Sequence, residues 1–141
     1  NTYDIDSGDG SGTFDGANNR NSSFGQLGSV PDTRLNLGFD WGTEQHSVSF
    51  YARHIGGYED RTPNNVYDSI DSFTVFDTQY SYSMSGVVGE GDTHLSIGVN
   101  NLTDEEPPAI DRNSANGRRA FDSLVHDPRG RIIYVRFKHN F

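Results

Sequence analysis

The sequence contains no cysteine, and its basic residues are few. The absence of cysteine excludes a disulfide framework and a thiolate metal site, and it leaves the redox compartment open. The 11 Lys and Arg residues stand against 20 Asp and Glu residues, which gives a formal net charge of -9. Because neutralising phosphate groups requires a basic surface, this balance argues against a nucleic-acid partner.

Long hydrophobic runs are also missing. The chain has no stretch of about 18 apolar residues, so no transmembrane helix is expected. The same observation does not bear on a transmembrane β-strand, because the sequence signal of such a strand is only about ten residues of alternating polarity.

Aromatic and turn-forming residues are abundant instead. Hydrophobic residues make up only 32% of the 141 residues, which is low for an ordinary core, and the chain contains 16 Gly. It nevertheless has 7 Tyr and 9 Phe, which is too aromatic for a disordered segment. The combination predicts β-strands joined by long loops.

Alternating polarity marks the strands, because successive side chains of a strand point to opposite faces. Residues 34–41, RLNLGFDW, alternate cleanly, with Leu35, Leu37, Phe39 and Trp41 on one face. Four further segments alternate in the same way. The sequence therefore predicts an all-β fold of about five antiparallel strands.

These strands are predicted as two hairpins and a tail. The hairpins cover residues 33–58 and 72–102, and the terminal strand covers residues 129–141. Residues 1–32 have no sustained periodicity and are predicted to be loop. Short turns at residues 42–45 and 85–92 then alternate with long connections, as in outer-membrane barrels, where periplasmic turns are short and extracellular loops are long.

This topology predicts an aromatic girdle at one membrane level, formed by Trp41, Tyr82 and Phe141. The terminal strand itself keeps one apolar face to its last residue, since Ile133, Phe137 and Phe141 share a face. Soluble β-sandwiches and soluble barrels also alternate, with the apolar face in a core. Periodicity alone does not separate these architectures.

Two motifs near the C-terminus resemble the TonB-dependent outer-membrane receptors. In that family the penultimate strand ends in an Asn-Leu-x-Asp motif, and a Gly-Arg pair opens a last strand that ends in Phe. Here the first motif runs from Asn101 to Asp104, the pair is Gly130 and Arg131, and the last residue is Phe141. The resemblance covers about residues 29 to 141.

The resemblance implies that residues 33–141 are the C-terminal strands of a transmembrane β-barrel in the bacterial outer membrane, and that residues 1–32 form an extracellular-type loop. Because the family's barrel has about twenty-two strands and a plug, the chain is expected to be an incomplete fragment. Five strands leave two unpaired sheet edges, so the isolated fragment is expected to associate with itself.

The resemblance also implies a function and partners. The intact receptor would actively transport a scarce solute, of the siderophore or oligosaccharide class, and would be energised by TonB through the N-terminal part that this chain lacks. The expected partners are the remaining barrel and plug, outer-membrane lipid and the barrel-assembly machinery. That machinery would read Tyr134, Phe137 and Phe141 in the final strand.

Two loops contain candidate binding residues. Asp4, Asp6 and Asp9 are closely spaced carboxylates of the kind that bind calcium, but their register departs from an EF-hand, and a solvated Gly/Asp loop is the preferred interpretation. A second loop carries three arginines, whose guanidinium groups suit carboxylate or phosphate groups on a ligand. These arginines are Arg112, Arg118 and Arg119. Asp111 and Asp122 balance part of this charge, so a simply charged loop is the preferred interpretation. The alternative function is a soluble extracellular β-sandwich binding module with a calcium loop.

No pattern predicts an enzyme. A Gly-x-Ser-x-Gly elbow is absent, so a hydrolytic triad has no support, and Gly-x-Gly-x-x-Gly is absent as well. The histidines lack the spacing of zinc ligands and are expected to be solvated or to face the barrel lumen. They are His46, His54, His94, His126 and His139. No cofactor is expected, unless Asp4, Asp6 and Asp9 bind calcium.

Overall fold

The computed structural model describes residues 4–6, 13–15, 17–20, 29–62, 65–86, 89–110 and 120–140. All regular secondary structure among these residues is β-strand. The chain divides into two compact units. Unit 1 comprises Asn1–Arg34, His54–Phe73 and Glu106–Pro128, and unit 2 comprises Leu35–Arg53, Thr74–Glu105 and Arg129–Phe141.

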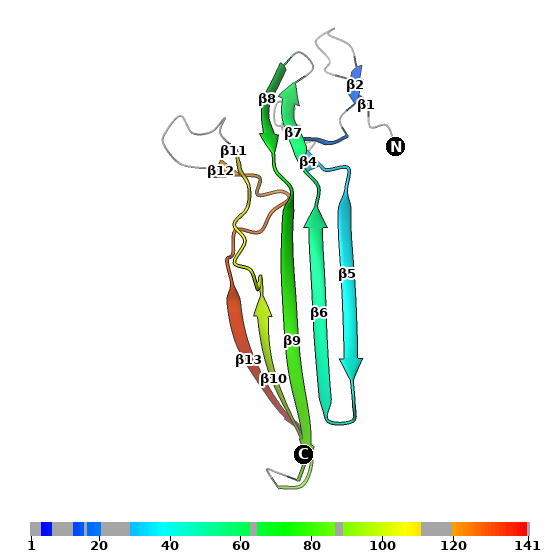
Figure 1. Ribbon diagram of the computed structural model, residues 1–141, viewed down its shortest axis with the longest axis vertical. Coiled ribbons are helices and arrows are strands. Elements are labelled where there is room, and N and C mark those ends of the chain that lie inside the picture. The colour runs from blue at the N-terminus through cyan, green and yellow to red at the C-terminus, as the bar shows by residue number, and fades with distance from the viewer. Residues whose placement is uncertain are drawn as a thin grey trace. The chain divides into compact units, whose positions relative to one another are not determined.

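The main feature of unit 2 is a five-stranded sheet with the order β13-β10-β9-β6-β5. Its strands are β5 (Arg34–Gly42), β6 (His46–Ile55), β9 (Phe73–Ser85), β10 (Asp92–Asn100) and β13 (Ile132–Asn140). The five strands lie side by side in the order in which they follow along the chain. Neighbouring strands run in opposite directions (Figure 1). The structure therefore confirms an all-β, antiparallel architecture with five main strands. The described strands do not close into a barrel, since β5 and β13 are the two edges.

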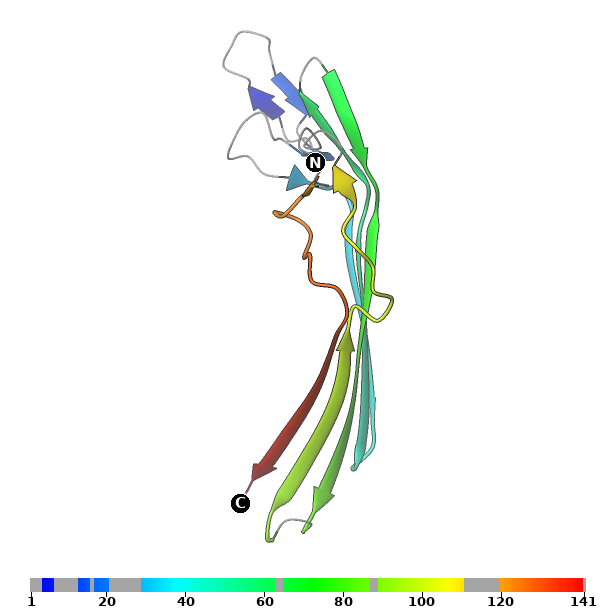
Figure 2. The same ribbon diagram turned by 90° about the vertical axis from the view of Figure 1, so that its left-hand side faces the viewer.

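The register of the strands places the apolar residues of neighbouring strands opposite one another. On the two sides of β10, Leu95 lies opposite Tyr82 of β9 and opposite Phe137 of β13, and Ile97 lies opposite Val135. Because cross-strand partners point to the same face, the apolar residues of neighbouring strands form continuous rows. The strands are twisted relative to one another, as Figure 2 shows.

Unit 1 contains shorter strands. A four-stranded sheet has the order β4-β3-β7-β8, and the pair β3 and β7 is parallel. Its strands are β3 (Asn19–Arg20), β4 (Ser29–Val30), β7 (Tyr58–Thr62) and β8 (Asn65–Ile70). Two small hairpins are formed by β1 (Asp4–Asp6) with β2 (Thr13–Asp15), and by β11 (Ala109–Ile110) with β12 (Ala120–Phe121). The buried core consists of Tyr58, Ile70 and Ile110, with Val125 packed against it.

The expected loops therefore contain strands that alternation did not predict. Residues 1–32 include β1 to β4, and the connection at residues 59–71 is mostly the hairpin of β7 and β8, which has a bulge between Asp60 and Arg61. Strands of two or three residues are too short to show a period of two. β7 and β8 are longer, but they are largely polar. Their sequences therefore lack the alternation of apolar and polar residues that identifies a strand.

Candidate functional site

One face of the five-stranded sheet carries large apolar side chains that remain exposed. Phe39 is 61% exposed, Val135 is 68% exposed and Phe137 is 62% exposed. We call this surface the apolar face. Its large exposed members are Leu35, Leu37, Phe39, Trp41, Phe50, Tyr80, Leu95, Ile97, Ile133, Val135 and Phe137. An antiparallel sheet in a water-soluble domain normally packs such a face on a core. Exposed apolar surfaces of this kind are typical of sites that contact another protein or a membrane.

Aromatic side chains pack on the apolar face and gather near its turn end. Phe50 and Phe76 stack with ring centroids 5.7 Å apart. Next to the turn at residues 42–45, the His46 ring lies 4.9 Å from the Tyr82 ring, and His46 Nδ1 is 2.7 Å from the Tyr80 hydroxyl. Aromatic rings with polar tips suit a boundary between water and an apolar phase.

The opposite face of the sheet is polar, and its side chains bond to one another. Asp40 accepts hydrogen bonds from Ser49 (2.5 Å) and Tyr51 (3.2 Å), which joins β5 to β6. Arg53 of β6 forms an ion pair of 2.9 Å with Asp77 of β9. Each of these bonds crosses from one strand to the next and satisfies a polar group within the sheet.

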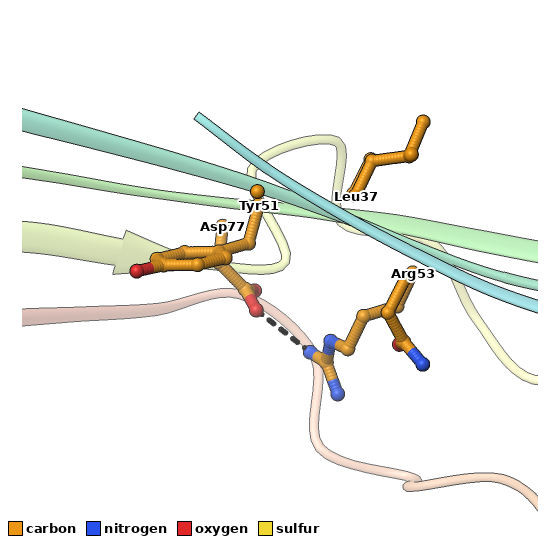
Figure 3. A pocket seen from close by; sticks show the side chains of 7 residues that line it. Leu37, Tyr51, Arg53 and Asp77 are labelled. Carbon is orange, nitrogen blue, oxygen red and sulfur yellow. Dashed lines mark hydrogen bonds and ion pairs between the residues drawn. The ribbon is translucent and has the colours of Figure 1, made fainter. Parts of the chain in front are cut away.

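A hollow of about 380 Å³ lies beside this network. It is lined by Asn36, Leu37, Gly38, Tyr51, Ala52, Arg53 and Asp77. Tyr51, Arg53 and Asp77 lie together on one side of the strands, whereas Leu37 points to the other side (Figure 3). The Arg53 side chain is half exposed, so its guanidinium can donate hydrogen bonds to a polar solute as well as to Asp77.

The network continues across β9, β10 and β13. Ser81 donates to Ser96 over 2.9 Å, and Ser83 lies 2.9 Å from His94 Nδ1. The hydroxyl of Tyr134 donates to Gln79 over 3.0 Å and so reaches from β13 past β10 to β9.

Tyr134 can reach that far because it lies over a glycine. Gly98 is directly opposite Tyr134 in the register, and a Cβ atom at Gly98 would be 2.8 Å from Tyr134 Cε1. A similar pair occurs near the other edge of the sheet, where a Cβ atom at Gly38 of β5 would be 2.9 Å from Tyr51 Cε1 of β6. Glycine inside a strand often marks such a close approach.

The Asn-Leu-x-Asp motif holds the beginning of the terminal strand. Asn101 and Asp104 have φ values of 54° and 58°, a left-handed conformation that Asn and Asp tolerate better than most residues. The buried Asn101 side chain exchanges two hydrogen bonds with the Glu105 backbone, of 2.8 and 2.9 Å. Asp104 accepts a 2.7 Å bond from the Arg131 backbone N–H and also pairs with the Arg131 guanidinium at 3.4 Å. The two motifs that carry the family resemblance are thus in direct contact.

The residues predicted to form the assembly signal do not share one environment. Phe137 lies on the apolar face and is exposed, whereas Tyr134 lies on the polar face and is bonded to Gln79. Phe141 lies outside the described residues. A recognition element that approached the apolar face would therefore meet Phe137 and not Tyr134.

Most of the candidate calcium and ligand-loop residues lie outside the described residues. Asp4 and Asp6 belong to β1, where they pair with Asp15 and Thr13 of β2. Asp9 and the three loop arginines (Arg112, Arg118 and Arg119) are outside the part of the chain that the structure describes. Within the described ranges, no group of three or more His, Asp or Glu side chains could hold a metal ion.

A buried polar group in unit 1 was not predicted from the sequence. Tyr58, Asp122 and His126 are 2%, 2% and 4% exposed. The Tyr58 hydroxyl donates to Asp122 over 3.0 Å and lies 3.1 Å from His126 Nε2, and Ser29 also donates to Asp122. We call these four residues the His126 cluster. They come from three segments far apart in the sequence, so no spacing pattern could reveal them.

The expectation of a solvated or lumen-facing histidine is wrong for His126. Its ring stacks on Tyr58 at 6.1 Å and contacts Phe73 edge-on at 5.1 Å. Burial disfavours the charged imidazolium and lowers the pKa of His126 below its ordinary value. The Asp122 carboxylate opposes this shift, and the Arg34 guanidinium adds to it.

Comparison with known proteins adds no relative. No protein-family model, curated protein or solved structure matches the chain. Among the described residues, no helix is long and apolar enough to cross a membrane.

Proposed function

We propose that this chain is the C-terminal part of the barrel of a TonB-dependent outer-membrane receptor, which actively transports a scarce solute. The exposed apolar face of the five-stranded sheet is the observation that carries the proposal. In the intact receptor this face would contact lipid, and the polar face would line the lumen.

Strand length supports a membrane role. β5, β10 and β13 each have 9 residues, β6 has 10 and β9 has 13. A tilted transmembrane β-strand needs about 9 to 11 residues. The sheet is therefore long enough to cross the hydrocarbon layer.

The distribution of polar groups also supports this role. In lipid, every backbone and side-chain polar group needs a partner inside the protein, because the hydrocarbon supplies none. The bonded groups of Asp40, Asp77 and Ser96 all lie on the face assigned to the lumen. A soluble sandwich would instead need a second sheet over the apolar face, yet Phe39 and Val135 are well over half exposed.

The family resemblance supports the more specific assignment to a receptor. Asp104 and Arg131, one from each motif of the resemblance, connect the segment after β10 to the start of β13. The solute would be of the siderophore or oligosaccharide class, and energy would come from TonB through the rest of the receptor. The chain itself would contribute lipid-facing wall, lumen lining and extracellular loops, without enzymatic activity.

An antibody raised against this chain tests the proposal in cells. We expect it to detect, in the outer-membrane fraction, a protein several times larger than 15.6 kDa whose electrophoretic mobility changes on heating. Folded barrels often resist detergent until they are heated, because all their backbone groups are paired. A band of about the mass of this chain in the soluble fraction would contradict the proposal.

A further inference from the structure

The His126 cluster holds a turn of unit 1 against a strand. Residues 122–126 form the turn, in which the Asp122 carbonyl accepts the N–H groups of Val125 (3.2 Å) and His126 (2.9 Å). Asp122 Oδ1 accepts the Leu124 N–H over 3.1 Å. The turn is joined to β7 by the bonds of Tyr58 to Asp122 and His126.

The proton positions in the cluster follow from its donors and acceptors. Tyr58 has one hydroxyl proton, and the ionised Asp122 can only accept, so the Tyr58 hydroxyl donates to Asp122. The same oxygen then accepts from His126, which places the imidazole proton on Nε2. In this neutral tautomer Nδ1 carries no proton, and this buried nitrogen has no hydrogen-bond partner among the described residues.

Protonation would disturb this arrangement. A second proton would sit on Nδ1, where the described residues offer no acceptor, and it would place a cation in a buried site. The Asp122 carboxylate attracts the charged imidazolium and reduces the cost of protonating His126. The Arg34 guanidinium, at the start of β5, repels the imidazolium and increases that cost. Asp60, two residues beyond Tyr58 on β7, is also buried. Phe73 of β9 offers only an aromatic ring.

We propose that the His126 cluster is an acid-sensitive latch, which holds the turn at residues 122–126 on β7 at neutral pH and releases it when His126 is protonated. The inference is independent of the proposed receptor function, because it concerns contacts within unit 1 alone. The turn then has a latched and a released state, and the pH of the medium determines which of the two is populated.

The direction of the pH dependence follows from linkage. The unfolded or released turn would have a histidine with the ordinary pKa of 6.5, whereas the latched state has a lowered pKa. Between these two pKa values the released state binds more protons, so the latched state loses stability as pH falls. The latch is thus fully effective above pH 6.5 and weakens as the pH falls through the lowered pKa.

Hydrogen exchange of the whole chain, followed by NMR, tests the latch. The protection of the Val125 and His126 amides is compared between about pH 7.5 and about pH 5, after correction for the intrinsic exchange rate. We expect protection to fall at the lower pH, because protonation of His126 favours the released turn. The fall should coincide with titration of the His126 ring.

Two variants separate the latch from general acid effects. His126→Gln keeps a side-chain N–H donor but does not titrate, so its protection should not change over this pH range. His54→Gln removes another histidine of unit 1 and should keep the wild-type response. An equal response in His126→Gln, or unchanged protection in the wild type, would overturn the proposal. If His126→Gln does not fold, a wild-type His126 ring that titrates while both amides stay protected also overturns it.

Discussion

At the scale of single residues, two glycines decide how the sheet is packed. Gly98 and Gly38 lie inside strands, where glycine usually weakens the structure because it has no side chain to pack. Here Tyr134 and Tyr51 fill the space that the missing side chains leave. Tyr134 uses this position to bond Gln79 two strands away, so the glycine permits a connection across three strands.

Gly98→Ala should therefore destabilise the sheet. The added methyl group would overlap the Tyr134 ring and force it away from Gln79, and overpacking of this kind costs about 1–3 kcal/mol. Chemical unfolding in detergent measures the loss. The double variant Gly98→Ala with Tyr134→Ala removes the overlap, so its cost should be smaller than the sum of the two single costs. Simple additivity would show that the ring and the glycine do not interact.

At the scale of the strands, alternating polarity was sufficient to predict the five-stranded sheet. The period of two occurs in all five strands (β5, β6, β9, β10 and β13), and the predicted antiparallel sheet is present. Alternation failed where strands are short or polar, as in β3 and β7, whose parallel pairing joins residues about forty positions apart. The His126 cluster was missed for a related reason, because burial of His126 depends on partners such as Tyr58, far away in sequence.

The motif residues of the terminal strand give a prediction at this scale. Asp104→Ala removes the acceptor for the Arg131 N–H and places alanine at a positive φ, so the beginning of β13 should fray. We expect a loss of about 1–3 kcal/mol and faster hydrogen exchange at Arg131. Asp104→Asn is the matched control, because Asn keeps an acceptor oxygen and tolerates the left-handed conformation. Equal exchange in the two variants would mean that the side-chain oxygen does not hold the strand.

At the scale of the whole molecule, the sheet has two chemically different faces and two open edges. β5 and β13 each have one side without a partner strand among the described residues. Unpaired N–H and C=O groups are costly in lipid, so a sheet that faces lipid needs further strands at both edges. The proposed larger barrel would pair both open edges with further strands and place the apolar face against lipid.

The central claim is that the apolar face contacts lipid, and site-specific labelling tests it most directly. The chain has no cysteine, so single cysteines can be introduced cleanly. Leu37→Cys and Val135→Cys place a fluorescent label on the apolar face, and their neighbours Asn36→Cys and Arg136→Cys place it on the polar face. The protein, as its gene encodes it, is reconstituted in phospholipid vesicles. Lipid-attached quenchers should quench positions 37 and 135, and water-soluble quenchers should quench positions 36 and 136. Labels at positions 37 and 135 that lipid-attached quenchers do not reach would contradict the account.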